Sequence, residues 1–184
     1  MSFRRLPTEM DEVVLLEPTV HGDERGFLVE TFRASAMPEL GIDVQFVQDN
    51  HSRSSARVLR GLHMQRGQAK LVRCPQGRIF DVAVDLRPDS PTYRRWEGYE
   101  LDDVNHRQLF VPDGFGHGFC VLSDGADVLY RLSTYFDADL ESGVAWDDPE
   151  IAVRWPITDP ILSERDRNAP PLAEVAAGLQ DRAG

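Results

Sequence analysis

Short stretches of alternating apolar and polar residues follow one another along most of this chain. The clearest one opens after Gly77. Its even-numbered side chains are all apolar: Phe80, Val82, Val84 and Leu86. Its odd-numbered side chains include two carboxylates: Ile79, Asp81, Ala83 and Asp85. Because the side chains of a strand alternate between its two faces, the pattern predicts a barrel wall, with one face packed and the other lining a polar cavity.

Similar stretches recur between turns about every 8–12 residues, a spacing typical of all-β sandwiches and barrels. We expect strands at 13–17, 27–32, 44–47, 58–65, 70–74, 93–101, 107–111, 118–122 and 128–135, with a turn at 21–26. Helices should be short: one at 34–40 that Gly41 closes, a capped turn at 163–166 and a terminal helix at 172–180. The 184 residues suit one domain, with a β core at about 10–158 and an irregular segment with a short helix at 159–184.

The stretch from Val58 to Gln65 carries an arginine and a histidine within an apolar run. On a flat strand Arg60 and His63 would lie on opposite faces, and only a bend or bulge at Gly61 would bring them together. His63 is then either a hydrogen-bonded core histidine or a functional group beside Arg60. This stretch alone favours the core histidine.

Charge and cysteine content limit the possible partners. The formal net charge of −11 argues against general binding to nucleic acid or to an anionic membrane. No run approaches membrane-spanning length, and the N-terminus has no signal-like apolar region. Both cysteines, Cys74 and Cys120, sit in apolar stretches, which is typical of free thiols in a reducing compartment. We therefore expect a cytoplasmic protein.

Five cations come from four separate segments of the chain: Arg25, Arg60, Lys70, Arg73 and Arg165. Arg60, Lys70 and Arg73 lie in or beside apolar strands, where an unpaired charge is costly. They need either internal carboxylates or an anionic ligand, and a phosphate would fit an otherwise acidic protein. Lys70 is the only lysine among 20 basic residues, which reflects either chance or a need for its compact charge.

Two further side chains are candidates for the cavity. His117 follows a Pro-Asp-Gly turn at the start of a strand, which is a good position for a ligand contact. His63 and His117 without a clustered carboxylate make a weak transition-metal site, so we expect no metal. Tyr130 shares a strand face with Val128 and is either a core residue or a phenol donor to the cavity.

Eight stretches in a characteristic order carry a family resemblance. They are 23–30, 48–52, 58–65, 70–73, 81–87, 112–119, 146–149 and 162–166. Together they resemble the dTDP-4-dehydrorhamnose 3,5-epimerase family, over about residues 13 to 172. The resemblance implies a metal-free cupin-type jelly-roll barrel that needs no cofactor and forms a homodimer. It also implies a dTDP-4-keto-6-deoxy sugar nucleotide as substrate, inverted at C3 and C5.

The implied reaction assigns roles to particular residues. Removal of a proton next to a ketone needs a base, a partner for the enolate oxygen and an acid on the opposite face of the sugar. By position, His63 matches the base and Asp166 the carboxylate that orients it. Lys70 matches the enolate partner, and Tyr130 matches the proton donor. We expect these residues, with Lys70, to contact the substrate: Arg25, Glu30, Gln48, Asn50, Arg60, Arg73, His117, Tyr135, Phe136, Glu141 and Arg165. The resemblance places Arg25 on the partner subunit.

Three departures from the family pattern leave the outcome of the reaction open. The loop between Gln65 and Lys70 is shorter than usual, Arg165 replaces a common lysine, and Phe136 replaces a second tyrosine. A phenyl ring still stacks on thymine or sugar but lacks the hydroxyl. The candidates are therefore double inversion, as in dTDP-L-rhamnose biosynthesis, or 3- or 5-monoepimerisation in an antibiotic-sugar pathway.

Two other function classes remain as alternatives: a metal-dependent cupin isomerase or oxygenase, and a non-catalytic jelly roll that binds a sugar nucleotide. For the dimer, the candidate surfaces are the early strands and the apolar face that begins at Phe80.

Overall fold

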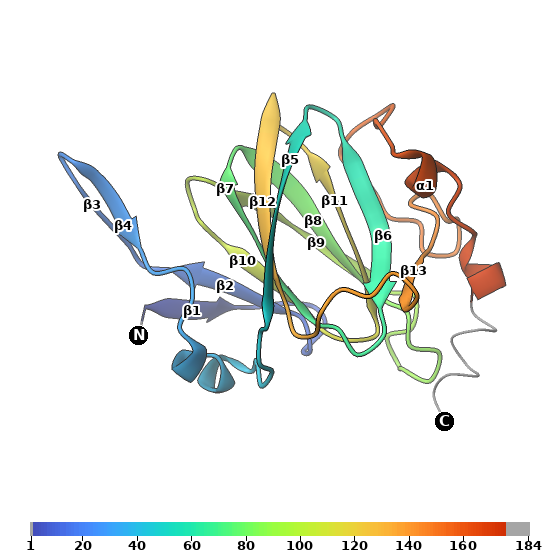
Figure 1. Ribbon diagram of the computed structural model, residues 1–184, viewed down its shortest axis with the longest axis horizontal. Helices are drawn as coiled ribbons and strands as arrows, with labels where there is room; N and C mark the ends of the chain where they lie inside the picture. Colours follow the sequence, from blue (N-terminus) through green and yellow to red (C-terminus); the bar gives the residue numbers. More distant parts are fainter. Residues whose placement is uncertain (1, 176–184) are drawn as a thin grey trace.

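The computed structural model describes residues 2–175 and shows two antiparallel sheets that form a barrel (Figure 1). The six-stranded sheet has the order β1 (Phe3–Leu6), β2 (Val14–Pro18), β10 (Gln108–Val111), β7 (Lys70–Gln76), β12 (Gly125–Leu132) and β5 (Gln48–Ser55). The five-stranded sheet has the order β13 (Glu141–Gly143), β6 (Leu59–Gln65), β11 (Phe115–Val121), β8 (Arg78–Asp85) and β9 (Trp96–Asp102). The expected all-β fold, a cupin-like jelly roll, is confirmed.

Apolar side chains fill three layers. The central layer lies between the sheets and joins residues such as Val72 and Leu109 of one sheet to Ile79 and Phe119 of the other. A second layer covers the outer face of the six-stranded sheet with residues from the 37–42 segment. A third lies on the outer face of the five-stranded sheet, under the C-terminal segment. Polar groups inside the barrel are therefore surrounded by protein.

The strand after Gly77 largely matches its predicted pattern. Ile79 and Ala83 point into the central layer with Asp81, which is fully buried. Its apolar face packs under Val144, Ile151 and Leu172 of the same chain. The prediction that this face is available for a dimer partner is therefore wrong, because the C-terminal segment already covers it.

Asp85 does not line a cavity, contrary to the barrel-wall prediction. Its carboxylate accepts hydrogen bonds from Arg87, Ser90 and Thr92 and closes the turn after β8. Burial opposes ionisation of Asp85, but these bonds outweigh it and lower its pKa to about 2. The carboxylate therefore has a structural role.

Several element boundaries also differ from the predictions. The 34–40 helix is two 3₁₀ turns, Ala34–Ala36 and Pro38–Leu40, since Pro38 cannot donate a hydrogen bond within one continuous helix. Residues 44–47 are not a strand: regular pairing begins at Gln48, and before it only Val47 N bonds to the neighbouring strand, donating to Leu132 O at 2.8 Å. The short helix α1 (Glu164–Arg167) is capped by Ser163 as expected. Of the predicted terminal helix, residues 172–175 are helical, and the remainder lies outside the described residues.

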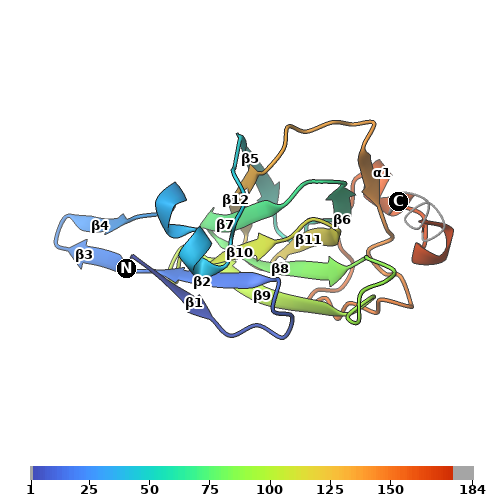
Figure 2. The same cartoon turned by 90° about the horizontal axis from the view of Figure 1, so that it is seen from below.

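One hairpin stands apart from the barrel. Strands β3 (Val20–Asp23) and β4 (Gly26–Val29) form a separate two-stranded sheet that projects from the end opposite β6 and α1 (Figures 1 and 2). Phe27 and Leu28 on this arm are 62% and 73% exposed. The arm is thus a two-stranded hairpin, a unit that is marginally stable on its own in water, and its apolar side chains are largely exposed.

Candidate active site

An irregularity in β6 brings Arg60 and His63 to one face. Across β11, Arg60 pairs with Phe119 and His63 pairs with His117, so three steps along β6 match two along β11. Gly61 at the bulge has a φ of +142°, and a Cβ there would lie 2.5 Å from the Cα of Gly118. Only glycine fits this close approach. The predicted bend at Gly61 is therefore confirmed, and both side chains face the barrel interior.

His63 meets a carboxylate from the C-terminal segment. Its Nε2 lies 2.5 Å from Oδ1 of Asp166, which is 103 positions further along the chain. Ser163 caps α1 and donates its hydroxyl to Oδ2 of Asp166 at 2.8 Å. Burial opposes ionisation of Asp166, but the bonds from His63 and Ser163 outweigh it and lower its pKa. The expected contact between His63 and Asp166 is present.

The segment that carries Asp166 is held along β6. Ile161 forms a parallel β-bridge with Val58, with hydrogen bonds from Leu59 N to Ile161 O and from Ile161 N to Arg57 O. Further on, Leu172 N donates to the buried carboxylate of Asp148 at 2.7 Å. We call residues 161–172 the C-terminal strap. Both of its ends are therefore tied down, with Asp166 between them.

Lys70 is a nearly buried cation close to His63. Its side chain is on the inner face of β7, it is 9% exposed, and Nζ donates to the carbonyl oxygen of His63 at 3.3 Å. Burial lowers the pKa of Lys70 to about 8, although Glu141 and Asp81 act against this shift. No carboxylate of the described chain forms an ion pair with it. Such an ammonium favours an anionic or electron-rich group brought in by a ligand.

Tyr130 faces the same interior. In the pairing of β12 with its neighbours, Tyr130 lies opposite Val72 on one side and Asn50 on the other. Lys70 and Val72 are two residues apart, so they lie on the same face of β7. The inner face of the six-stranded sheet therefore carries Lys70, Tyr130 and Asn50. Tyr130 also packs against the central apolar layer. The side chain of Tyr130 therefore points towards the inside of the barrel.

A second histidine and carboxylate lie deeper in the barrel. His117, directly opposite His63 in the strand pairing, has its Nε2 2.8 Å from Oδ1 of Asp81. Both residues are buried, and Oδ2 of Asp81 has no hydrogen-bond partner among the described residues. A buried carboxylate hydrogen-bonded to a histidine fixes the orientation of the ring. Two histidine–carboxylate pairs thus line one interior.

The other predicted contact residues surround this interior. Arg60 is at the exposed rim, and its Nε donates to Ser54 at 3.1 Å. Glu141 and Arg165 form an ion pair of 2.5 Å, and Glu141 also acts electrostatically on Lys70. At another part of the rim, the loop of residues 133–137 presents two exposed aromatic rings, Tyr135 and Phe136.

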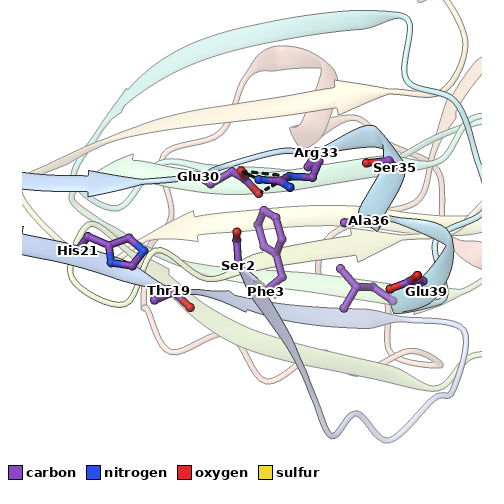
Figure 3. Close-up of a pocket in the computed structure, with 10 residues that line it drawn as sticks. Ser2, Phe3, Thr19, His21, Glu30, Arg33, Ser35, Ala36 and Glu39 are labelled. Carbon is purple, nitrogen blue, oxygen red and sulfur yellow. Dashed lines mark hydrogen bonds and ion pairs between the residues drawn. The ribbon is translucent and has the colours of Figure 1, made fainter.

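Three predicted contact residues are not brought to the site in this subunit. Arg25 is on the arm, where it pairs with Asp23. Glu30 follows the arm and pairs with Arg33 at the wall of a surface cavity of about 510 Å³ (Figure 3). Arg73 alternates onto the outer face of β7, opposite to Lys70, next to Arg131 and Asp49. The prediction that Arg73 contacts a ligand in this interior is therefore wrong.

Sequence reasoning missed several residues that organise the site. Asp148 holds the strap, Ser163 holds Asp166, and Asp81 holds His117. Gln65 and Gln68 bind the 133–137 loop through their side-chain amides. The one available signal for Gln65 was its spacing from His63, because residues two apart in a strand share a face.

These features define a class of protein: a cupin-like jelly roll with a polar interior that holds acid–base side chains. Among the described residues, no three His, Cys, Asp or Glu side chains gather in a way that could hold a metal ion. The helices of the described part of the chain are too short or too polar to cross a membrane.

The chain belongs to the dTDP-4-dehydrorhamnose 3,5-epimerase family, whose model matches residues 7–174. It is 49% identical over 177 residues to the dTDP-4-dehydrorhamnose 3,5-epimerase of Methanothermobacter thermautotrophicus, covering 94% of this chain and 96% of that protein. The 3,5-epimerase of Legionella pneumophila, solved with dTDP-4-keto-L-rhamnose, superposes with a TM-score of 0.92 at 44% identity and covers 96% of each chain. Family membership makes the protein an epimerase, in the isomerase class.

Another relative is named for inversion at a single carbon. The dTDP-4-dehydrorhamnose 3-epimerase of Streptomyces niveus is 42% identical over 182 residues and covers 96% of this chain and 88% of that protein. The family therefore includes enzymes named for one centre and enzymes named for two.

Proposed function

We propose that the protein inverts carbons next to the C4 ketone of a dTDP-4-keto-6-deoxy sugar. The observation that carries the proposal is the convergence of His63, Asp166 and Lys70 on one interior. A base, its orienting carboxylate and a cation are the groups needed to form and stabilise an enolate. Relatives that share 49% and 44% of the sequence are named for this chemistry or were solved with such a sugar nucleotide.

In the proposed reaction His63 is the general base. Its Nε2 is engaged by Asp166, so Nδ1 is the nitrogen left to take the proton from C3 or C5. Asp166 then stabilises the imidazolium that forms. The C–H electron pair moves into the enolate, and Lys70 places its ammonium near the oxygen that gains charge.

Tyr130 is the proposed proton donor. It comes from the six-stranded sheet, whereas His63 comes from the five-stranded sheet, so the two groups enter the cavity from facing walls. Inversion needs this arrangement, because the proton must leave from one face of the sugar and return to the other. The phenol gives its proton to the carbanion carbon, and the enolate returns to the ketone. Solvent then reprotonates the tyrosine and takes the proton from the His63 imidazolium.

The nucleotide diphosphate would occupy the rim. Arg60 and Arg165 supply positive charge there in a protein with a net charge of −11, and His117 offers a ring nitrogen deeper in the interior. Gln48 and Asn50 line the same inner face, and the exposed rings of Tyr135 and Phe136 can stack on the base.

We also propose that the enzyme is a homodimer whose arms exchange. Arg25 and Glu30 are distant from their own barrel interior, and the arm exposes Phe27 and Leu28. A partner's arm that covers this apolar surface would deliver Arg25 and Glu30 to the facing site. The compartment we propose is the cytoplasm, because Cys74 and Cys120 are both free thiols, as is typical of proteins in a reducing compartment.

A second candidate is inversion at one centre only. Phe136 lacks a hydroxyl at a position where many relatives carry tyrosine, and a 42% identical relative is named a 3-epimerase. The two candidates share all proposed roles of His63, Lys70 and Tyr130. They differ in how many C–H bonds the base can reach.

One assay tests the proposal and separates the candidates. The protein is incubated with a dTDP-4-keto-6-deoxy sugar in D₂O, and proton NMR follows the signals of C3–H and C5–H. Loss of both signals supports double inversion, and loss of one supports monoepimerisation. Retention of both signals while dTDP still binds, seen by calorimetry, would support a non-catalytic binding protein instead. Exchange that requires a stoichiometric metal, measured by elemental analysis, would support the metal-dependent alternative.

A further inference from the structure

The loop of residues 133–137 combines exposed rings with a firmly held backbone. Tyr135 is 73% exposed and Phe136 is 50% exposed, so neither ring is anchored by the core. The backbone of the loop is nevertheless bonded to buried or half-buried side chains. Gln48 Oε1 accepts from Phe136 N at 2.9 Å, and Gln68 Nε2 donates to Thr134 O at 3.3 Å.

Gln65 makes the largest contribution to this attachment. It is 3% exposed, and it points to the same face of β6 as His63. Its Nε2 donates to Tyr135 O at 2.9 Å and to the Thr134 hydroxyl at 3.3 Å, while its Oε1 accepts from Asp137 N at 2.8 Å. Both the donor and the acceptor of this buried amide therefore bond to the same loop.

We propose that Gln65 is a positioning residue for the nucleotide end of the site: it fixes the aromatic loop relative to His63 so that Tyr135 and Phe136 form a preorganised wall for the base. The inference rests on the proposed function, because it takes the ligand to be a nucleotide sugar. Gln65 touches neither the base nor the sugar and acts only through the loop.

The chemistry of the amide makes the role specific. A donor must face Tyr135 O and an acceptor must face Asp137 N, which an amide provides at once. An ionised carboxylate keeps the acceptor for Asp137 N but turns its second oxygen towards the carbonyl oxygen of Tyr135, and the repulsion would push the loop away. A protonated carboxylic acid has the same length and again offers one donor and one acceptor. Gln65→Glu should therefore be a defect that low pH repairs.

The test measures the dissociation constant of dTDP by calorimetry for the full-length protein and for Gln65→Glu at pH 8 and pH 5.5. At pH 8 we expect binding about 10-fold weaker in the variant, equivalent to about 1.4 kcal/mol. At pH 5.5 the ratio of variant to wild type should fall towards one. In deuterium exchange at pH 8, KM should rise by a similar factor, while kcat at saturation stays within about threefold.

Two controls separate positioning from general destabilisation. Thr92→Val removes a buried hydrogen bond to Asp85 at a distant turn, and it should lower the unfolding temperature without weakening dTDP. Gln68→Met removes the bonds of Gln68 Nε2 to the carbonyl oxygen and the hydroxyl of Thr134 and keeps a side chain of similar size. Gln68→Met should weaken dTDP binding about threefold. If Gln65→Glu does not fold, Gln68→Met tests the proposal in its place.

Several results would overturn the inference. Unchanged dTDP affinity in Gln65→Glu and Gln68→Met, or a loss that Thr92→Val reproduces at equal stability, would remove the positioning role. A fall in kcat with dTDP affinity intact would mean that Gln65 acts on His63 and not on the loop. Wild-type protein that binds dTDP but exchanges no C–H contradicts the proposed function alone, since the loop test is read from dTDP affinity.

Discussion

At the scale of single residues, three polar side chains from three separate segments meet in one interior. His63 comes from β6, Lys70 from β7 and Asp166 from the strap, and each is at least partly buried. Lys70 is the one for which burial has the clearest consequence. Its pKa of about 8 places loss of its charge within the range where enzymes are assayed.

The first prediction concerns the pH dependence of Lys70. The ammonium is charged below about pH 8 and neutral above it, so a reaction that needs the cation should lose kcat/KM as pH rises through 8. Lys70→Arg keeps its charge across this range, and its residual activity should show no such decline. Lys70→Met should slow exchange by about 10²–10³-fold. If kcat/KM of Lys70→Arg still declines as pH rises through 8, the decline belongs to another group.

At the scale of secondary-structure elements, the site depends on a bulge in β6 and on the strap beside it. The bulge turns Arg60 and His63 to one face, and the strap brings Asp166 to His63. Asp148 ties the strap to the preceding turn: it is 3% exposed and accepts from Glu150 N, Ile151 N and Leu172 N. Removal of this carboxylate would leave three backbone donors without partners.

The second prediction concerns this attachment. Asp148→Ala should lower the free energy of unfolding by about 2–3 kcal/mol. It should also lower kcat about 10-fold with little change in dTDP affinity, because Asp166 becomes less well placed. Urea denaturation and deuterium exchange measure the two effects. Asp103→Ala, which removes a surface bond to Gly77 N, is the control. A normal kcat in Asp148→Ala would show that the strap holds Asp166 by its other contacts alone.

Sequence patterns predicted the parts of the fold that depend on local alternation. The two-face pattern of β8 and the need for a bend at Gly61 both follow from side-chain alternation along a strand. The pattern could not show that Asp85 closes a turn or that the C-terminal segment covers the apolar face of β8, because these contacts are not local.

The candidate site was predictable only in part, for the same reason. The resemblance named His63 and Asp166, but their contact joins residues 103 positions apart. The motif that contains Lys70 also contains Arg73, and strand alternation sends the two cations to opposite faces. Gln65 has no charge or reactive group that would mark it in a sequence, and its role appears only through its bonds to the loop.

At the scale of the whole molecule, the arm of β3 and β4 is the part that the barrel does not stabilise. It exposes Phe27 and Leu28, and it carries Arg25 away from its own interior (Figure 1). The apolar face of β8, in contrast, is occupied by the chain itself. An exchanged arm would account for both the exposure and the missing contact residue.

The third prediction tests whether Arg25 acts on the partner's site. Arg25→Ala and His63→Ala should each be nearly inactive as homodimers, but coexpression should restore activity in mixed dimers. With random pairing, about one quarter of all sites would combine an intact His63 with a partner's intact Arg25. Activity near this level in the purified mixture is the expected result. No gain over the separate variants, with mixed dimers verified by mass spectrometry, would place Arg25 on its own subunit's site or outside it.

The role of His63 as the base is tested most directly by measuring C–H exchange in a variant that lacks its imidazole. Wild type and His63→Ala are compared by proton NMR in D₂O with a dTDP-4-keto-6-deoxy sugar, and calorimetry with dTDP checks that the nucleotide site is intact. We expect exchange in the wild type and a loss of about 10³-fold or more in His63→Ala with dTDP binding retained. Exchange at the wild-type rate in His63→Ala would contradict the assignment of His63 as the base.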